Sequence, residues 1–436
     1  MKRSRDPQCK TDVSHTQFDR RKSKCGCGSP LVVSCGVCEK LFSYAHFKQH
    51  EKGCQQIGEG GDRHDIVPRT VRFAYLQSDW KFSGQNGFET QPKGQFWDGL
   101  PNGAPVFRVH KVTDRSMPGQ EWMDSYDAVF AHIASDETFE CVHIFKDWQE
   151  VRTLVNATSP LSAVKALAGV NLIVLGNWVH DIVLKDGEAS HEAIMVWHQR
   201  LERLELELDC RIFPPLDYIM YFARKEVYYR HLGRSTLPIS LECIPTLFIS
   251  HLQKSWKKDS VEFVGDAEAI VFKRSVSERK LHMHLVKKDA IKSLVLFDRG
   301  TKGLTWLVQP DIPQFREYNE IRLYFVGGNL LWGVTSNFDA NGDIALFAFG
   351  KGLHGGEWDS ALVHAAKTLV ELVATRLNTH ARHFLRVDLI KKCDGRWYIN
   401  ELEPFGNTFL HMEVNSDSYE FFPRLVAEIK EWMRVV

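Results

Sequence analysis

Hydrophobic positions change their spacing along the chain, and this pattern predicts a mixture of strands and helices. Short apolar runs at 71–76, 170–175 and 211–215 are typical of buried strands. Between the last two, residues 188–206 carry apolar side chains at helical spacing, so we expect an amphipathic helix there. The order of strand, helix and strand predicts an open α/β sheet in this part of the chain.

The second half of the chain contains more strands and tighter turns. Residues 320–332 contain Gly327-Gly328 between two apolar runs, which predicts a β-hairpin. Residues 238–248 predict a strand that enters a turn. The other expected elements are helices over 216–232, 356–378 and 418–433, and strands over 269–273, 281–286 and 304–310.

A second hairpin is expected within residues 386–407, which read RVDLIKKCDGRWYINELEPFGN. Asp394-Gly395 is the turn signal between its two strands. Antiparallel pairing would bring Asp388 on one strand beside Glu401 and Glu403 on the other. Because residues 401 and 403 are two apart, their side chains point to the same face. The sequence therefore predicts that three carboxylates converge.

Carboxylates at such close range repel one another, so their convergence favours a bound cation. Their ligand atoms are all oxygen, which suits Mg²⁺ held together with nucleotide phosphates better than zinc. The alternative is a solvated acidic hairpin. The apolar neighbourhood weighs against it, and consists of Trp397, Tyr398, Ile399, Pro404 and Phe405.

Length and composition predict a globular protein of several domains. The chain has 436 residues, of which 44% are hydrophobic and 11% aromatic, and its net charge is +0. Apolar runs are too short for a membrane span, and the stretch MKRSRDPQCKTD lacks the apolar core of a secretory signal. We expect no membrane partner and a reducing compartment, the cytoplasm or alternatively the nucleus. The expected boundaries are 1–54, a Gly-rich polar linker over 55–70, 71–215 and 216–436.

Six of the ten cysteines lie before residue 55, and four positions there have the spacing of a zinc site. Cys35 and Cys38 are separated by two residues, and His50 and Cys54 by three, which is close to the zinc-finger pattern. Cys25 and Cys27 offer a second ligand set with Cys35 and Cys38, with His46 as a spare ligand. These alternatives stay open. The isolated Cys141, Cys210, Cys243 and Cys393 are expected in the core.

Residues 1–54 carry eleven Lys or Arg against five Asp or Glu. A basic segment of this kind permits contact with nucleic acid. It fits equally well a solvated leader on a finger that binds a protein. The sequence does not decide between a nucleic-acid and a protein partner for this segment.

The order of motifs over residues 165–435 resembles the ATP-grasp superfamily, which includes D-alanine–D-alanine ligase, glutathione synthetase and the ribosomal-protein glutamate ligases. The resemblance implies that Lys225 and Lys273 contact the nucleotide. It also implies an adenine hinge at Gln309, Pro310, Asp311 and Ile312, followed by the pair Glu320 and Arg322. Asp388 and Glu401 match the metal carboxylates of the family. On this basis 71–215 is a domain that precedes the ATP-grasp domain of 216–436.

Two positions depart from the family pattern. Glu403 stands where the family usually has Asn, which adds a negative charge at the metal. The loop after Lys273 reads RSVSERK and has no glycine, whereas the family commonly covers the phosphates with glycine-rich backbone. The Glu-Pro-Phe-Gly ending also resembles ATP-grasp chaperones that help to assemble a translation initiation factor, which is a second functional hypothesis.

The leading expectation is an ATP- and Mg²⁺-dependent ligase that joins a carboxylate to an amine through an acyl phosphate. The substrate would be an amino acid or peptide. Lys273, Arg322 and Arg386 are the expected catalytic cations, because the reaction needs positive charge around the transferred phosphoryl group. The alternatives are an ATP-binding assembly factor, or a zinc-finger nucleic-acid-binding protein with a degenerate ATP-grasp domain. The expected cofactors are ATP, Mg²⁺ and Zn²⁺.

Overall fold

The structure is a computed structural model, and it divides into two units that are described separately. One unit comprises Met1–Arg69 with Glu431–Val436, and the other Thr70–Lys430. The described residues are 32–34, 41–43, 70–76, 90–92, 109–111, 121–124, 132–134, 136–145, 150, 153, 167–175, 191–276, 283–297, 304–314, 320–338, 344–348, 359–404 and 421–434.

In the smaller unit, β1 (Val32–Ser34) and β2 (Leu41–Ser43) form an antiparallel pair. Ser34 lies opposite Leu41, so the two strands flank residues 35–40 in the sequence. The four predicted zinc ligands Cys35, Cys38, His50 and Cys54 lie outside the described residues, as do the alternative ligands Cys25, Cys27 and His46.

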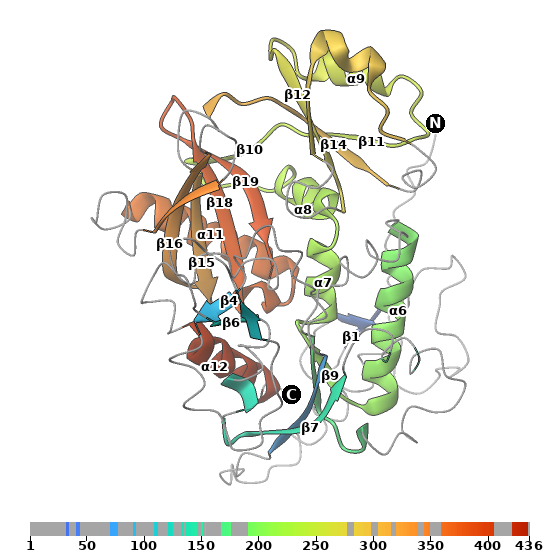
Figure 1. The fold of residues 1–436 in the computed structure, drawn as a ribbon, viewed down its shortest axis with the longest axis vertical. Coiled ribbons are helices and arrows are strands. Elements are labelled where there is room, and N and C mark those ends of the chain that lie inside the picture. The colour runs from blue at the N-terminus through green and yellow to red at the C-terminus, as the bar shows by residue number, and fades with distance from the viewer. Residues whose placement is uncertain are drawn as a thin grey trace. The chain divides into compact units, whose positions relative to one another are not determined.

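A four-stranded parallel sheet opens the larger unit, in the order β7-β3-β8-β9. Its strands are β3 (Val71–Leu76), β7 (Phe139–Phe145), β8 (Leu172–Leu175) and β9 (Arg211–Phe213). The helix α6 (His191–Leu208) connects β8 to β9 (Figure 1). Residues 73–76 and 172–175 are buried, as their apolar runs predict. The expected open α/β sheet is confirmed.

A small antiparallel sheet comes from a stretch for which the sequence predicted no element. It has the order β4-β6-β5 and is built from β4 (Thr90–Pro92), β5 (Val109–Lys111) and β6 (Glu121–Asp124). These strands are three or four residues long, which is too short for an alternation of apolar and polar residues to be recognised.

The single helix expected over 216–232 is in fact two helices, α7 (Leu216–Phe222) and α8 (Lys225–Leu232). Arg224 between them has an extended backbone, with φ −133° and ψ 113°. The Lys225 amide donates to the Ser275 carbonyl at 2.8 Å instead of to a preceding turn. The break therefore places the first residue of α8 beside the end of a distant strand.

A four-stranded antiparallel sheet has the order β11-β14-β12-β13. It comprises β11 (Leu247–Ile249), β12 (Ala269–Arg274), β13 (Met283–Lys287) and β14 (Trp306–Pro310). The helix α9 (Trp256–Phe263) and the 3₁₀ helix Lys288–Ser293 accompany one face. The core on that face includes Ile249, Val264, Ile270, Phe272, Trp306 and Val308. Lys273 alternates with Phe272, so it points to the opposite face.

The largest sheet has six strands in the order β10-β19-β18-β15-β16-β17. They are β10 (Leu241–Cys243), β15 (Glu320–Val326), β16 (Asn329–Phe338), β17 (Ile344–Ala348), β18 (Leu385–Lys391) and β19 (Trp397–Glu403). β10 pairs with β19 in parallel, and the other pairs are antiparallel. Both predicted turns are present, with φ of 60° at Gly327, 71° at Gly328 and 85° at Gly395.

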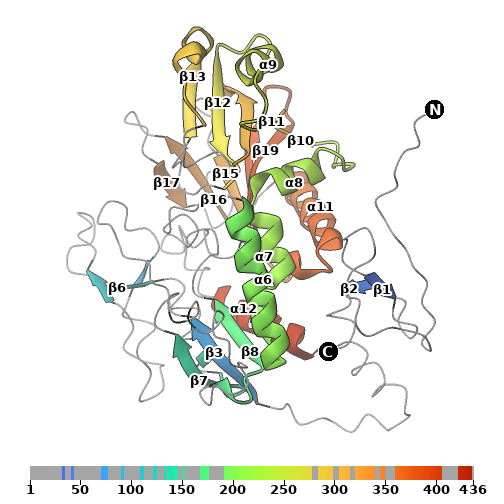
Figure 2. The same ribbon diagram turned by 90° about the vertical axis from the view of Figure 1, so that its right-hand side faces the viewer.

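Helix α11 (Ser360–Arg376) lies along this sheet (Figures 1 and 2) and buries an apolar stripe that includes Leu362, Leu369 and Val373. A short 3₁₀ helix, His380–Arg382, links α11 to β18, and α12 (Phe421–Arg434) follows β19 in the chain. Within the described part of the chain, no helix combines the length and apolar character needed to cross a membrane.

The expectation that the isolated cysteines are core residues is only partly right. Cys210 is buried, and Cys141 and Cys243 are half-buried. Cys393 is exposed, because it lies in the turn between β18 and β19 and not in either strand.

Candidate functional site

Charged residues share one face of the six-stranded sheet because the strand register aligns them. Asp388 on β18 lies opposite Glu401 on β19 and opposite Arg322 on β15. One row further along, Arg386 lies opposite Glu403. The side chains between them along β18 are the buried apolar Val387 and Leu389, which point to the other face.

The alternation of side chains is broken at one place in β19. Asp388 pairs with Glu401 and Leu389 pairs with Ile399, so Asn400 is an extra residue at a β-bulge. The bulge brings the Asn400 side chain to the charged face, where its Nδ2 donates to Glu320 Oε1. Asn400 is buried, and sequence reasoning did not assign it to the site.

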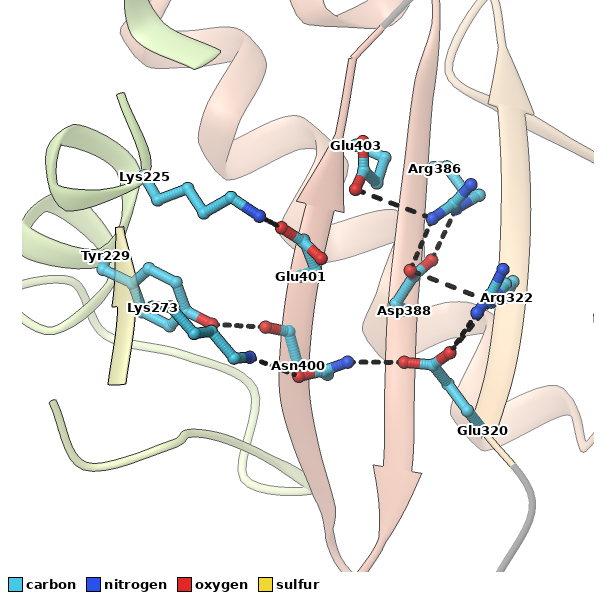
Figure 3. A network of polar contacts seen from close by, with 10 residues as sticks. All are labelled: Lys225, Tyr229, Lys273, Glu320, Arg322, Arg386, Asp388, Asn400, Glu401 and Glu403. Atoms are coloured by element: carbon cyan, nitrogen blue, oxygen red, sulfur yellow. Dashed lines mark hydrogen bonds and ion pairs between the residues drawn. The ribbon is translucent and has the colours of Figure 1, made fainter. Parts of the chain in front are cut away.

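Two lysines reach this face from outside the sheet (Figure 3). Lys225, the first residue of α8, forms an ion pair with Glu401. Lys273, on β12 of the four-stranded sheet, donates to Asn400 Oδ1 at 3.4 Å. The hydroxyl of Tyr229 on α8 donates to the Asn400 carbonyl. Two separate elements, α8 and β12, therefore converge on β19.

Two guanidinium groups bind the acids on the sheet. Arg386 donates from Nε and from its terminal nitrogen to the two oxygens of Asp388, each at 2.7 Å. Arg322 donates to Glu320 Oε2 at 2.9 and 2.7 Å, and its Nε lies 4.0 Å from Asp388. Glu403 lies 3.8 Å from Arg386. Arg386 and Asp388 are only 4% and 2% exposed, so this pair is shielded from water.

Burial and neighbouring charges perturb the pKa values of these groups. Burial, together with the nearby Lys225, lowers the pKa of Lys273 to about 8. Burial raises the pKa of Asp388 to about 6, against the opposing effect of Arg386. For Glu320, burial raises the pKa, but Arg322 and Asn400 outweigh it and the net pKa is lowered. Arg386 has its pKa raised well above the ordinary value by Asp388, although burial opposes this.

The Lys273 face of the four-stranded sheet offers apolar surface beside the charged groups. Lys273 lies opposite Met283, and Val271 in the next row lies opposite Leu285 and Gln309. Met283 is 41% exposed and Leu285 is 57% exposed, although both are apolar. This face therefore combines a lysine with exposed apolar side chains.

The predicted hinge residues lie at the end of β14 and immediately after it. Gln309 is 2% exposed and donates to Thr246 Oγ1 at 2.9 Å. Pro310 ends β14, the Asp311 amide donates to the Ala269 carbonyl at 3.0 Å, and Ile312 is buried. These residues therefore lie beside the Lys273 face, at the end of the same sheet.

The three predicted magnesium ligands lie on one face, but each is bound to or lies near a cation. In the described part of the chain, no group of three or more His, Cys, Asp or Glu residues is arranged to hold a metal ion. Asp388 pairs with Arg386 and Glu401 with Lys225, while Glu403 lies near Arg386. Most of the loop after Lys273, residues 277–280, is outside the described residues, and only Ser275 and Val276 continue the chain after Arg274.

Sequence reasoning missed two polar residues of this site, Tyr229 and Asn400. The signal for Asn400 is present in the sequence, since Asn400-Glu401 places two adjacent polar residues in a strand that should alternate. Adjacent polar residues can reach one face only if a bulge intervenes. Tyr229 carries no such signal, because the sequence of a helix does not show which atom a tyrosine hydroxyl will contact.

The fold of this chain is similar to those of several solved structures. D-Cycloserine synthetase DcsG is similar with a TM-score of 0.52 and 13% identity, covering 83% of this chain and 99% of that chain. D-Alanyl-alanine synthetase A from Vibrio cholerae has a TM-score of 0.48 and 12% identity, with coverage of 83% and 99%. The ATP-grasp ligase PsnB in complex with a minimal precursor has a TM-score of 0.46 and 9% identity, with coverage of 82% and 99%.

No protein-family model matches the sequence, and no curated protein matches it. At 13% identity, the similarity to D-cycloserine synthetase concerns the fold and not the activity. Over 83% of its length, the chain shares the mixed α/β fold of D-cycloserine synthetase DcsG.

Proposed function

We propose that this protein is an ATP- and Mg²⁺-dependent ligase that joins a carboxylate to an amine. One observation supports the proposal above the others. Lys225 on α8 and Lys273 on β12 belong to elements outside the six-stranded sheet, yet both reach the acidic face of that sheet at β19. Cations on one side and carboxylates on the other are the arrangement that a metal-bound polyphosphate needs.

The donor set fits magnesium and a nucleotide. Asp388, Glu401 and Glu403 offer only oxygen atoms, which Mg²⁺ prefers, and Mg²⁺ usually shares its coordination with substrate phosphates. The cations that now neutralise these acids would be drawn to the phosphates. One guanidinium nitrogen of Arg386, Nη1, is buried and has no hydrogen-bond partner among the residues that the structure describes, which leaves a donor for an incoming oxygen. When bound, Mg²⁺ would neutralise charge on the phosphates.

The residues of the chain have distinct roles in the proposed reaction. Lys225 and Lys273 hold the phosphates, Met283 and Leu285 cover the base, and Gln309 meets its polar edge. Arg386 and Arg322 supply positive charge where the carboxylate substrate accepts the γ-phosphoryl group. An amine then attacks the acyl phosphate, and inorganic phosphate leaves. The protein contributes chiefly position and electrostatic stabilisation.

The test is ADP release by the purified chain at saturating ATP and Mg²⁺, with a panel of amino acids and short peptides as carboxylate and amine. The proposal expects that a pair of substrates stimulates ADP release and yields a product with a new amide bond, detected by mass spectrometry. ADP release that no carboxylate or amine stimulates would contradict the ligase function. Nucleotide binding in that case would favour the ATP-binding assembly factor, whose support is the glycine-free loop after Lys273.

A separate proposal concerns Cys35, Cys38, His50 and Cys54, which have the spacing of a zinc site. We infer that they bind one Zn²⁺ and that this finger binds a protein or nucleic-acid partner. The double variant Cys35→Ser/Cys54→Ser is expected to lose zinc, because two of four ligands are removed. Elemental analysis measures this, with Cys393→Ser as the control for an exposed cysteine. Full zinc content in the double variant would show that the ligand set is wrong.

A further inference from the structure

The amide of Asn400 lies between a cation and an anion. Its Oδ1 accepts from the Lys273 ammonium at 3.4 Å, and its Nδ2 donates to the Glu320 carboxylate. Only one orientation of the amide satisfies both neighbours, since a flipped amide would place its NH₂ against the ammonium and its oxygen against the carboxylate. The two charged groups therefore determine which way the amide points.

The backbone of Asn400 is held from a third direction. The Tyr229 hydroxyl on α8 donates to the Asn400 carbonyl, and Asn400 is the extra residue of the bulge in β19. A bulged residue is not fixed by the strand ladder, so the tyrosine supplies a contact that the ladder lacks. Asn400, on β19, is thus linked to β12 and β15 through its side-chain amide and to α8 through its backbone carbonyl.

We propose that Asn400 is a positioning residue, held by Tyr229 and Glu320, that fixes the ammonium of Lys273 through its side-chain oxygen. The role of a positioned Lys273 rests on the proposed nucleotide-binding function. The hydrogen bonds that position it do not depend on that function. Lys273 is on a different sheet from Glu320, and the side chain of Asn400 forms a hydrogen bond with each of them. Its effect on a reaction would therefore pass through Lys273.

Other charged groups also affect the pKa of Lys273. Lys225 from α8 lowers its pKa, while Glu320 from β15, Asp388 from β18 and Glu403 from β19 raise it. All of these charged groups are retained when Asn400 is replaced, and among them Glu320 loses a hydrogen bond from Asn400. Because Oδ1 of Asn400 accepts a hydrogen bond from the ammonium, it favours the charged form of Lys273, and its loss leaves a larger neutral fraction at a given pH.

The experiment measures the reactivity of Lys273 in the full chain without any nucleotide. Trace labelling with acetic anhydride at pH 7, read out by mass spectrometry, reports the neutral amine. Asn400→Leu is expected to raise the labelling rate of Lys273 by roughly three- to tenfold, since loss of a hydrogen bond to a charged group shifts its pKa by up to about one unit. Asn400→Asp keeps the shape, adds a negative charge, and is expected to lower the rate.

Matched controls separate positioning from general loosening of the fold. Tyr229→Phe is expected to raise Lys273 labelling less than Asn400→Leu does. Tyr221→Phe removes a hydroxyl that contacts His231 at 2.7 Å outside this network, and is expected to leave Lys273 unchanged. The exposed Lys258 should react equally in every variant.

Two outcomes would overturn the inference: equal labelling of Lys273 in wild type, Asn400→Leu and Asn400→Asp, or equal increases in Tyr221→Phe and Tyr229→Phe. Titration of the same variants with Mg-ATP tests the proposed function separately. Failure of the wild type to bind Mg-ATP would refute the nucleotide site, while the labelling result would still decide whether Asn400 positions Lys273.

Discussion

The variant Asp388→Asn is expected to lose Mg²⁺-dependent nucleotide binding and to be strongly destabilised. Asp388 accepts two hydrogen bonds of 2.7 Å from Arg386, and both residues are almost fully buried. Asparagine keeps the shape but leaves the Arg386 charge uncompensated, and removal of one partner of a buried pair typically costs about 3–5 kcal/mol. Chemical denaturation measures the free energy of unfolding, and titration calorimetry measures Mg-ATP affinity.

The control for this variant lies in the turn of the same hairpin. Asp394→Asn removes a carboxylate that pairs with Arg396 at the surface, and it is expected to change neither stability nor Mg-ATP affinity appreciably. Glu403→Gln is expected to weaken Mg-ATP binding with a smaller loss of stability, because Glu403 is 3.8 Å from Arg386. Wild-type stability and affinity in Asp388→Asn would rule out both roles of this residue.

The sequence predicted the carboxylate hairpin because its constraints are local. Asp394-Gly395 fixes the turn, and Val387 and Leu389 fix which face of β18 carries the apolar side chains. Once those two features are set, Asp388 must lie near Glu401. The same reasoning predicted the hairpin of β15 and β16, where Gly327 and Gly328 adopt positive φ.

Partners of the charged residues could not be predicted in the same way. The sequence shows that Lys225 and Glu401 carry opposite charges, but they are 176 residues apart. Their pairing depends on the break between α7 and α8, which is itself stabilised by the bond from the Lys225 amide to Ser275 on another segment. A periodic apolar pattern continues across the break, so periodicity alone predicts one helix.

The site is positioned by two sheets, one with a charged face and one whose face combines a lysine with apolar side chains. The six-stranded sheet presents Asp388, Glu401 and Arg386, and the four-stranded sheet presents Lys273 beside exposed apolar side chains. The chain passes directly from β10 of one sheet to β11 of the other through Ile244–Thr246. Thr246 on that connection accepts a hydrogen bond from Gln309, so the hinge residue is tied to the segment that joins the sheets.

The variant Lys273→Met is expected to separate an enzyme from a scaffold. In a ligase, Lys273 neutralises phosphate charge that is more demanding in the transition state than in the bound ground state. The variant is therefore expected to lose turnover by a factor of roughly 10²–10³, while ATP affinity falls much less. ADP release and Mg-ATP titration measure the two quantities. Lys225→Met is the matched control, and is expected to act mainly on nucleotide affinity.

The pH dependence provides an independent check of the same lysine. Because burial lowers the pKa of Lys273 to about 8, the ammonium is charged below that pH and loses its charge as the pH rises through it. The ratio kcat/KM, which reports groups of the free enzyme, is expected to fall above about pH 8. Lys273→Arg should remove this fall, because a guanidinium remains charged throughout the range. A high-pH limb that persists in Lys273→Arg, or equal losses of turnover and affinity in Lys273→Met, would show that Lys273 does not stabilise the transition state.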